Sequence, residues 1–191
     1  MKYILGLLVA TLIIGGVIFG FRAGRKQTFN TPAGSVSSSS TTSRGNVLDL
    51  SNKGLTRVGA DIYNQTSATE LILSNNNIRA LPTEMGRMNN LISFKIDHNI
   101  MVGSLIGEIR QMSKLKQLDV SYNKMTGMPA EIGQLNSLES LNYSYNNITG
   151  LPNELANLKN NLKDLILTGN PLDKSQISKI KVELPNTTIV F

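Results

Sequence analysis

The feature of this 191-residue chain that most constrains its fold is an internal repeat that begins near residue 46. The clearest copies are LDLSNKGLTRV (48–58), LILSNNNIRALP (71–82), LDVSYNKMTGMP (118–129) and LNYSYNNITGLP (141–152), and the looser copies are FKIDHNIMVGSL (94–105) and LILTGNPL (165–172). An equivalent apolar residue of each unit falls at Leu48, Leu71, Phe94, Leu118, Leu141 and Leu165, with intervals of 23, 23, 24, 23 and 24 residues. A period in this range indicates a solenoid, because one unit alone cannot bury its apolar side and stacks on its neighbours.

Each unit opens with a segment that alternates like a half-buried strand. Leu71 and Leu73, for example, alternate with Glu70 and Ile72, which predicts a strand with one side buried. Parallel strands at a spacing of ~4.8 Å give six units a sheet roughly 25–30 Å long, a short arc. The other residues expected to point inward are Leu91, Leu115, Leu138 and Leu162, which open their units, and Ile78, Leu81, Met85 and Met88.

The repeat resembles the leucine-rich repeat, whose pattern is L-x-x-L-x-L-x-x-N-x-L. The segment LPTEMG (81–86) is similar to that of the 23-residue repeats of bacterial and Ras-suppressor-like members, and the resemblance covers about 145 residues. It implies an α/β solenoid with a parallel sheet on its concave face, resembling small bacterial membrane-anchored proteins of the family. It also implies a non-catalytic module without a cofactor that recognises a protein partner through that face.

Five asparagines share one position in successive units: Asn76, Asn99, Asn123, Asn146 and Asn170. A chain that leaves a strand in a tight turn exposes backbone N–H and C=O groups, and a buried amide side chain satisfies both kinds. We therefore expect a structural asparagine ladder. The first unit has Lys53 at this position, as expected of a solvated terminal repeat.

Residues 173–191 are expected to form a C-terminal cap, with a helix over 173–184 and a closing strand over 187–191. One face of the helix carries Ile177, Ile180 and Leu184. The third unit has one extra residue and lacks proline, and Tyr143 and Gln65 replace aliphatic residues, so we expect local adjustments at these places.

Residues 3–21 form a run of 19 residues without a charge, which predicts a transmembrane helix within an anchor at 1–26. A cleaved signal peptide is the alternative, but Phe21 and Arg22 occupy positions where a cleavage site needs small residues. Gly16 and Gly20 are spaced for close helix packing, which would give a homodimer through the anchor. The alternative is that glycine is simply common in membrane helices.

Residues 27–45 are rich in Ser, Thr and Gly and predict a flexible linker between the anchor and the repeat domain at 46–191. Such a stalk favours an extracytoplasmic repeat domain of a single-pass membrane protein at the cell surface. The basic residues Arg22, Arg25 and Lys26 favour a cytoplasmic side instead. The alternative function is therefore a cytoplasmic-facing membrane scaffold that organises a signalling or envelope complex.

The net charge of +6 does not indicate nucleic-acid binding, because its excess lies near the predicted anchor. Residues 1–45 carry five basic and no acidic residues, whereas 46–191 carry 14 basic and 13 acidic ones. The chain has no Cys and one His, which excludes disulfides, thiolate zinc sites, a cysteine nucleophile and a His-rich metal site. Nucleotide-binding and hydrolase motifs are absent too, so we expect no cofactor, including no small-molecule cofactor.

A Ser-His-Asp triad could be built only from His98, Ser121 and a neighbouring aspartate. Ser121 occupies the same repeat position as Ser51, Ser74 and Ser144, however, and the repeat explains it. We therefore expect no enzyme activity.

The concave face is the most plausible binding site, because residues between the inward leucines are expected to point to solvent. Its centre combines aromatic residues with charges of both signs, a composition typical of interface hot spots. The predicted partner-binding residues are Lys95, Asp97, His98, Asp119, Tyr122, Asn142 and Tyr145.

Overall fold

The computed structural model describes residues 46–191. The predicted anchor, its Gly16 and Gly20 packing face, and the linker at 27–45 lie outside the described residues and stay predictions. Within the described part of the chain, no helix is both long and apolar enough to cross a membrane.

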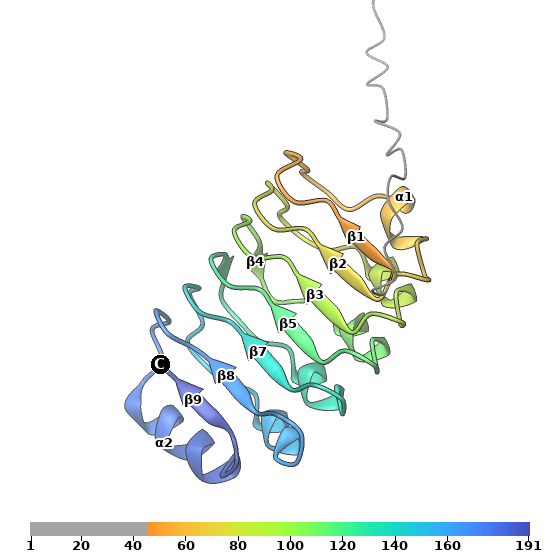
Figure 1. The fold of residues 1–191 in the computed structure, drawn as a ribbon. Coiled ribbons are helices and arrows are strands. Elements are labelled where there is room, and N and C mark those ends of the chain that lie inside the picture. The colour runs from red at the N-terminus through yellow and green to blue at the C-terminus, as the bar shows by residue number, and fades with distance from the viewer. Residues whose placement is uncertain (1–45) are drawn as a thin grey trace, which may run out of the picture. The chain divides into compact units, whose positions relative to one another are not determined.

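A seven-stranded parallel sheet runs along one side of the solenoid, as Figure 1 shows. Its strands, in spatial order, are β1 (Val47–Asp49), β2 (Glu70–Ile72), β3 (Ser93–Lys95), β5 (Gln117–Asp119), β7 (Ser140–Asn142), β8 (Asp164–Ile166) and β9 (Thr188–Val190). The register aligns the six predicted inward residues from Leu48 to Leu165 in one row, and Ile189 of β9 continues it. The predicted parallel solenoid is therefore confirmed. Below, the solvent side of this sheet is called the concave face.

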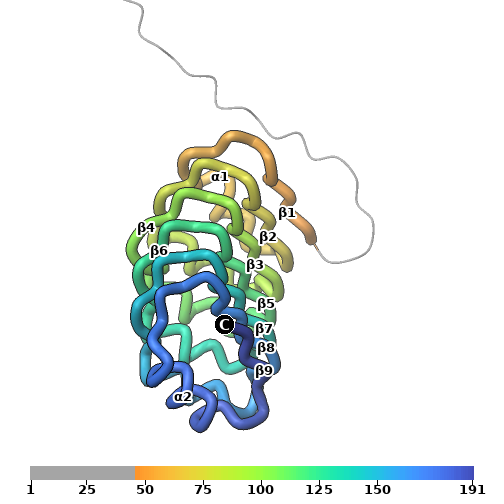
Figure 2. The backbone as a smooth tube through the Cα atoms, turned by 90° about the vertical axis from the view of Figure 1, so that its left-hand side faces the viewer, coloured from red at the N-terminus to blue at the C-terminus, as the bar shows by residue number. Residues whose placement is uncertain are grey.

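Short helices form the opposite, convex side, and the coils stack one behind another (Figure 2). They are α1 (Ala60–Tyr63) and the 3₁₀ helices η1 (Thr83–Arg87), η2 (Gly107–Gln111), η3 (Ala130–Gln134) and η4 (Asn153–Leu158). Proline precedes three of the 3₁₀ helices, because its fixed φ suits the extended residue before the first turn. In the third unit Ile106 takes that place with a φ of −66°.

The core fills the space between the sheet and the convex helices. The residues predicted to point inward are buried, and most of them are fully inaccessible to solvent, except Leu48 of the first unit, which is half-buried. The coils also approach each other closely on the convex side. A Cβ atom added to Gly133 would lie 2.1 Å from the carbonyl oxygen of Glu154, so only glycine fits there.

The third unit shows the expected local adjustment. Its extra residue lies in a segment that forms β4 (Val102–Gly103), which pairs in parallel with β6 (Lys124–Met125) to make a second, two-stranded sheet. Gln65 is exposed, whereas Tyr143 is fully buried in the core. The hydroxyl of Tyr143 has no hydrogen-bond partner among residues 46–191.

The C-terminal cap consists of α2 (Lys174–Glu183) and β9. The Asp173 side chain accepts a hydrogen bond from the backbone N–H of Gln176 at 2.8 Å and so caps the helix. Ile177, Ile180 and Leu184 are buried, and β9 extends the sheet by one strand in parallel to β8.

Candidate functional site

The turn that ends each concave strand is built around the asparagine ladder. The Asn123 amide nitrogen donates to the carbonyls of Ile96 and Val120 at 3.0 and 3.1 Å, and its oxygen accepts from the N–H of Met101 at 2.9 Å. The same bonds to its own and the preceding unit recur at Asn76, Asn99, Asn146 and Asn170. These bonds fix the backbone of the residue that precedes each asparagine.

The residue at this repeat position has a positive φ in every unit, including Asn52, which precedes Lys53 in the first unit. The values are 57° at Asn52 and Asn75, 51° at His98, 52° at Tyr122, 54° at Tyr145 and 77° at Gly169. Asparagine and glycine tolerate this left-handed conformation, and histidine is moderately frequent there, but a bulky tyrosine is uncommon. The turn therefore projects aromatic side chains from two positions that disfavour them.

His98, Tyr122 and Tyr145 form a continuous stack, which we call the aromatic ladder. The ring centroids of His98 and Tyr122 are 4.3 Å apart with planes inclined by 16°, and those of Tyr122 and Tyr145 are 4.4 Å apart at 18°. At the far end the Tyr145 ring lies over Gly169, where an added Cβ atom would be 2.7 Å from the tyrosine Cδ1. Tyr122 is still 44% exposed with both ring faces covered, so the ladder presents ring edges to solvent.

The imidazole of His98 is held by Asp97, and Asp97 is held in turn by Ser74. Its Nδ1 lies 2.8 Å from Asp97 Oδ2, and the hydroxyl of Ser74 donates to Asp97 Oδ1. Because the carboxylate accepts, Nδ1 carries a hydrogen and the neutral ring has its lone pair on Nε2. Ser74 and Asp97 thus set both the orientation and the tautomer of the end residue of the ladder.

Asp119 is held in a different way. Its Oδ1 accepts from the backbone N–H and the hydroxyl of Ser121 at 2.9 and 2.6 Å, and its Oδ2 accepts from the Asn142 amide at 3.1 Å. Lys95 stands opposite Asp119 in the strand register but instead binds Glu70 Oε1 at 3.1 Å. The structure therefore places the seven predicted residues on one face as three groups: the ladder with Asp97, the Asp119–Asn142 pair, and Lys95 with Glu70.

The serines of the concave strands are not solvent-facing as expected. Ser74, Ser121 and Ser144 are buried, because each small hydroxyl folds against a neighbouring carboxylate or amide. Ser121 donates to Asp119 and not to His98, so these residues are not arranged as a Ser-His-Asp triad. Among residues 46–191, no group of three or more His, Asp or Glu side chains is placed to hold a metal ion.

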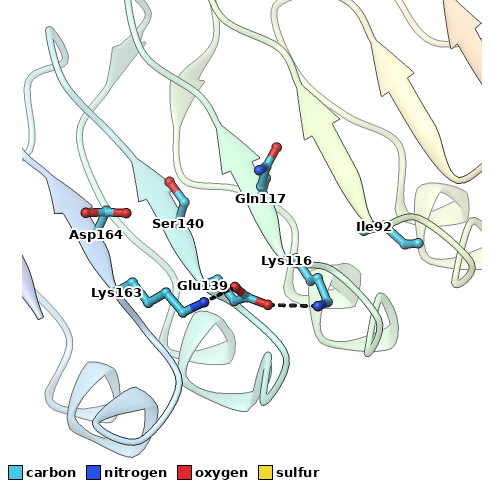
Figure 3. Close-up of a pocket in the computed structure, with 7 residues that line it drawn as sticks. All are labelled: Ile92, Lys116, Gln117, Glu139, Ser140, Lys163 and Asp164. Carbon is cyan, nitrogen blue, oxygen red and sulfur yellow. Dashed lines mark hydrogen bonds and ion pairs between the residues drawn. The ribbon is translucent and has the colours of Figure 1, made fainter. Parts of the chain in front are cut away.

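A second concave feature lies where the strands begin. Ile92, Lys116, Gln117, Glu139, Ser140, Lys163 and Asp164 line an open pocket of about 310 Å³ (Figure 3). Glu139 bridges the two lysines, with 2.8 Å from Oε1 to Lys116 Nζ and 2.6 Å from Oε2 to Lys163 Nζ. Hydrogen bonds from Lys116 and then Lys163 lower the pKa of Glu139 to about 2.

Comparison with known proteins agrees with this geometry. The family model described as Leucine Rich Repeat matches residues 137–158, the fifth unit. This chain is a leucine-rich repeat protein. Over 67 residues it is 36% identical to the human leucine-rich repeat and fibronectin type III domain-containing protein 1, a match that covers 35% of this chain and 9% of the human protein.

Two solved structures extend the likeness to a larger share of this chain. A protein of Leptospira interrogans is 28% identical with a TM-score of 0.58, over 71% of this chain and 40% of that one. The Arabidopsis receptor kinase HAESA, solved with the peptide hormone IDA and a co-receptor, is 28% identical with a TM-score of 0.66, over 81% of this chain and 27% of that one. This chain thus spans less than half the length of each of these three relatives.

Two features of this leucine-rich repeat protein were missed from the sequence. The sequence does contain a sign of the stacking of His98, Tyr122 and Tyr145, since the three residues share one repeat position. The Lys116–Glu139–Lys163 bridge had one as well, because these residues immediately precede successive strands and alternate in charge.

Proposed function

We propose that this leucine-rich repeat protein is a recognition module without chemistry of its own, which binds a protein or peptide on its concave face. The observation that carries the proposal is the exposed stack of His98, Tyr122 and Tyr145. A similar fold in HAESA was solved with a peptide hormone. The ladder is the proposed anchor, with Asp97, Asp119, Asn142 and Lys95 around it.

The chemistry of the ladder supports a protein partner. Tyrosine offers a large amphipathic contact at low entropy cost, and the stack already fixes the rings before binding. Sugars and nucleic-acid bases use open aromatic faces, but both faces of Tyr122 are covered. The nearly balanced charge of residues 46–191 also disfavours a phosphate backbone.

The backbone supports a role beyond folding. A left-handed conformation costs roughly 1–2 kcal/mol for a residue other than glycine or asparagine. Stacking offsets part of this cost, at about 0.5–1.5 kcal/mol for an aromatic pair. Tyr122 and Tyr145 thus stand at positions where asparagine, as at Asn52 and Asn75, would satisfy the fold.

The double variant Tyr122→Asn, Tyr145→Asn tests this function. It removes the rings but keeps residues suited to the turn. We expect capture of the partner to weaken by about 2 kcal/mol or more, roughly 30-fold. Asn52→Gly, at the same repeat position in the first unit, is the matched control, because glycine also suits this turn, and it should leave capture unchanged. Undiminished capture by the double variant would refute the site.

We further propose that residues 3–21 anchor the module in a membrane and that the linker at 27–45 holds the repeats on the extracytoplasmic side. The uncharged run and the Ser-rich composition support this placement. Arg22, Arg25 and Lys26 support the alternative of a cytoplasmic scaffold. Protease treatment of intact cells decides: release of the repeats favours the first, and protection until the membrane is opened favours the second.

A homodimer through Gly16 and Gly20 is a separate proposal about the anchor. The four-residue spacing supports it, because it allows two membrane helices to approach closely. Replacing both glycines with isoleucine should abolish crosslinking between anchors. Crosslinking that persists in this variant would rule out the glycine interface.

A further inference from the structure

The end of the aromatic ladder offers a hydrogen-bond acceptor with a defined position. Asp97 occupies the Nδ1 side of His98 at 2.8 Å, so Nε2 of the neutral ring is left with its lone pair. The His98 side chain is 49% exposed. The phenolic oxygens of Tyr122 and Tyr145 belong to the same stack and can also accept.

Two carboxylates beside the ladder lack a neutralising lysine or arginine. Across residues 46–191, the only ion pair of Asp97 is with His98, and Asp119 has none. Lys95, the nearest candidate in the register, is taken by Glu70. Their hydrogen-bond donors, Ser74, Ser121 and Asn142, are all neutral. With neutral His98, the Lys95–Glu70 pair cancels and the two aspartates leave this part of the face negative.

Building on the proposed function, we propose that the partner presents an arginine side chain to the ladder, next to Asp97 and Asp119. A guanidinium is planar, always charged and carries five N–H donors. It therefore matches a surface of separated acceptors with an unneutralised negative charge. A ligand carboxylate or phosphate would be repelled by the same two aspartates.

The test uses two peptides, acetyl-Gly-Arg-Gly-Arg-Gly-amide and its counterpart with neutral citrulline for arginine. The full-length protein in detergent micelles is labelled with ¹³C-histidine, and the NMR signals of His98, the single histidine, report binding. We expect saturable shifts with the arginine peptide and at least tenfold weaker binding of the citrulline peptide. Equal binding of both peptides, or no shift at millimolar arginine peptide, would overturn the assignment.

Variants of two equivalent aspartates distinguish the effect on binding of a charge at the ladder from that of a charge elsewhere on the face. Asp49 and Asp119 each accept from the N–H and hydroxyl of the serine two residues later. Asp119→Asn should weaken the arginine peptide several-fold, whereas Asp49→Asn, in the first unit, should not. Equal effects of the two variants would count against the ladder.

The outcomes also separate this inference from the proposed function. If the partner is lost from the Tyr122→Asn, Tyr145→Asn variant but the peptides bind equally, the arginine assignment is wrong and the function stands. If the double variant captures the partner normally, the function itself fails, and the arginine assignment fails with it.

Discussion

The ring of Tyr122 stacks on the ring of Tyr145 at a centroid distance of 4.4 Å, although the two residues hold φ values of 52° and 54°. The asparagine ladder beneath them imposes this backbone, so the rings are aligned by the repeat and not by a ligand. Preorganised aromatic groups lose little entropy on binding. This relationship is the basis for placing recognition at the end of the concave strands.

Asn123→Ala should destabilise the domain by about 1–3 kcal/mol, because buried carbonyls of Ile96 and Val120 and the N–H of Met101 would lose their partner. Asn147→Ala is the matched control, since Asn147 is exposed. Urea denaturation followed by circular dichroism measures both. Equal midpoints for the two variants would mean that the ladder contributes no stability.

Gly133→Ala should also destabilise the fold, by roughly 1–3 kcal/mol, since the new methyl group would collide with the backbone of Glu154 in η4. Gly127→Ala places its methyl group 3.9 Å from the nearest atom, Cβ of Ser104, and should be tolerated. Thermal unfolding distinguishes them. A melting temperature for Gly133→Ala as high as that for Gly127→Ala would refute the close approach of η3 and η4.

Tyr143→Phe should stabilise the protein by about 1 kcal/mol, because it removes a buried hydroxyl without a partner among residues 46–191. Burial raises the pKa of Tyr143 far above its ordinary value. A raised folded-state pKa gives stability that is present below pH 10 and lost at higher pH, as the unfolded chain ionises. The variant should therefore lose less stability above pH 10 than the wild type. Lower stability of Tyr143→Phe at pH 7 would contradict this reasoning.

Glu139→Gln should reduce the dependence of stability on acid pH. Bridging by Lys116 and Lys163 lowers the Glu139 pKa to about 2. A lowered folded-state pKa gives stability that is present above about pH 4.5 and lost as the pH falls toward 2. The free energies of unfolding of the variant and the wild type, measured between pH 5 and 2, should thus converge as the pH falls. Parallel curves would show that the bridge does not stabilise the fold.

Most of the fold could be predicted from the sequence because one pattern repeats six times. The equivalent apolar residues from Leu48 to Leu165 define the strand positions, and the asparagines define the turns. The strand register and the connection from one unit to the next therefore follow from the spacing of these residues. The cap followed from the helical face of Ile177 and Ile180. The β4–β6 pairing was not specified, because an extra residue in the third unit can be absorbed in several ways.

The residues of the candidate site could be predicted from the sequence, but the contacts between their side chains could not. The repeat placed His98, Tyr122 and Tyr145 in one column, yet stacking depends on side-chain torsions that the pattern does not fix. Alternation places Ser74 and Ser121 toward solvent, but both serines are buried, because their hydroxyls donate to the carboxylates of Asp97 and Asp119. Lys95 likewise binds its diagonal neighbour Glu70 and not Asp119, which lies directly opposite it in the strand register.

Site-specific photo-crosslinking tests the central claim, recognition on the concave face, most directly. Benzoylphenylalanine would replace Asn142 on β7 or the exposed Gln134 on the convex η3, in cells that make the protein. We expect one adduct of defined mass from position 142, none from position 134, and loss of the adduct when Tyr122→Asn and Tyr145→Asn are added. An adduct from position 134 with none from 142 would place the partner on the convex side and contradict the account.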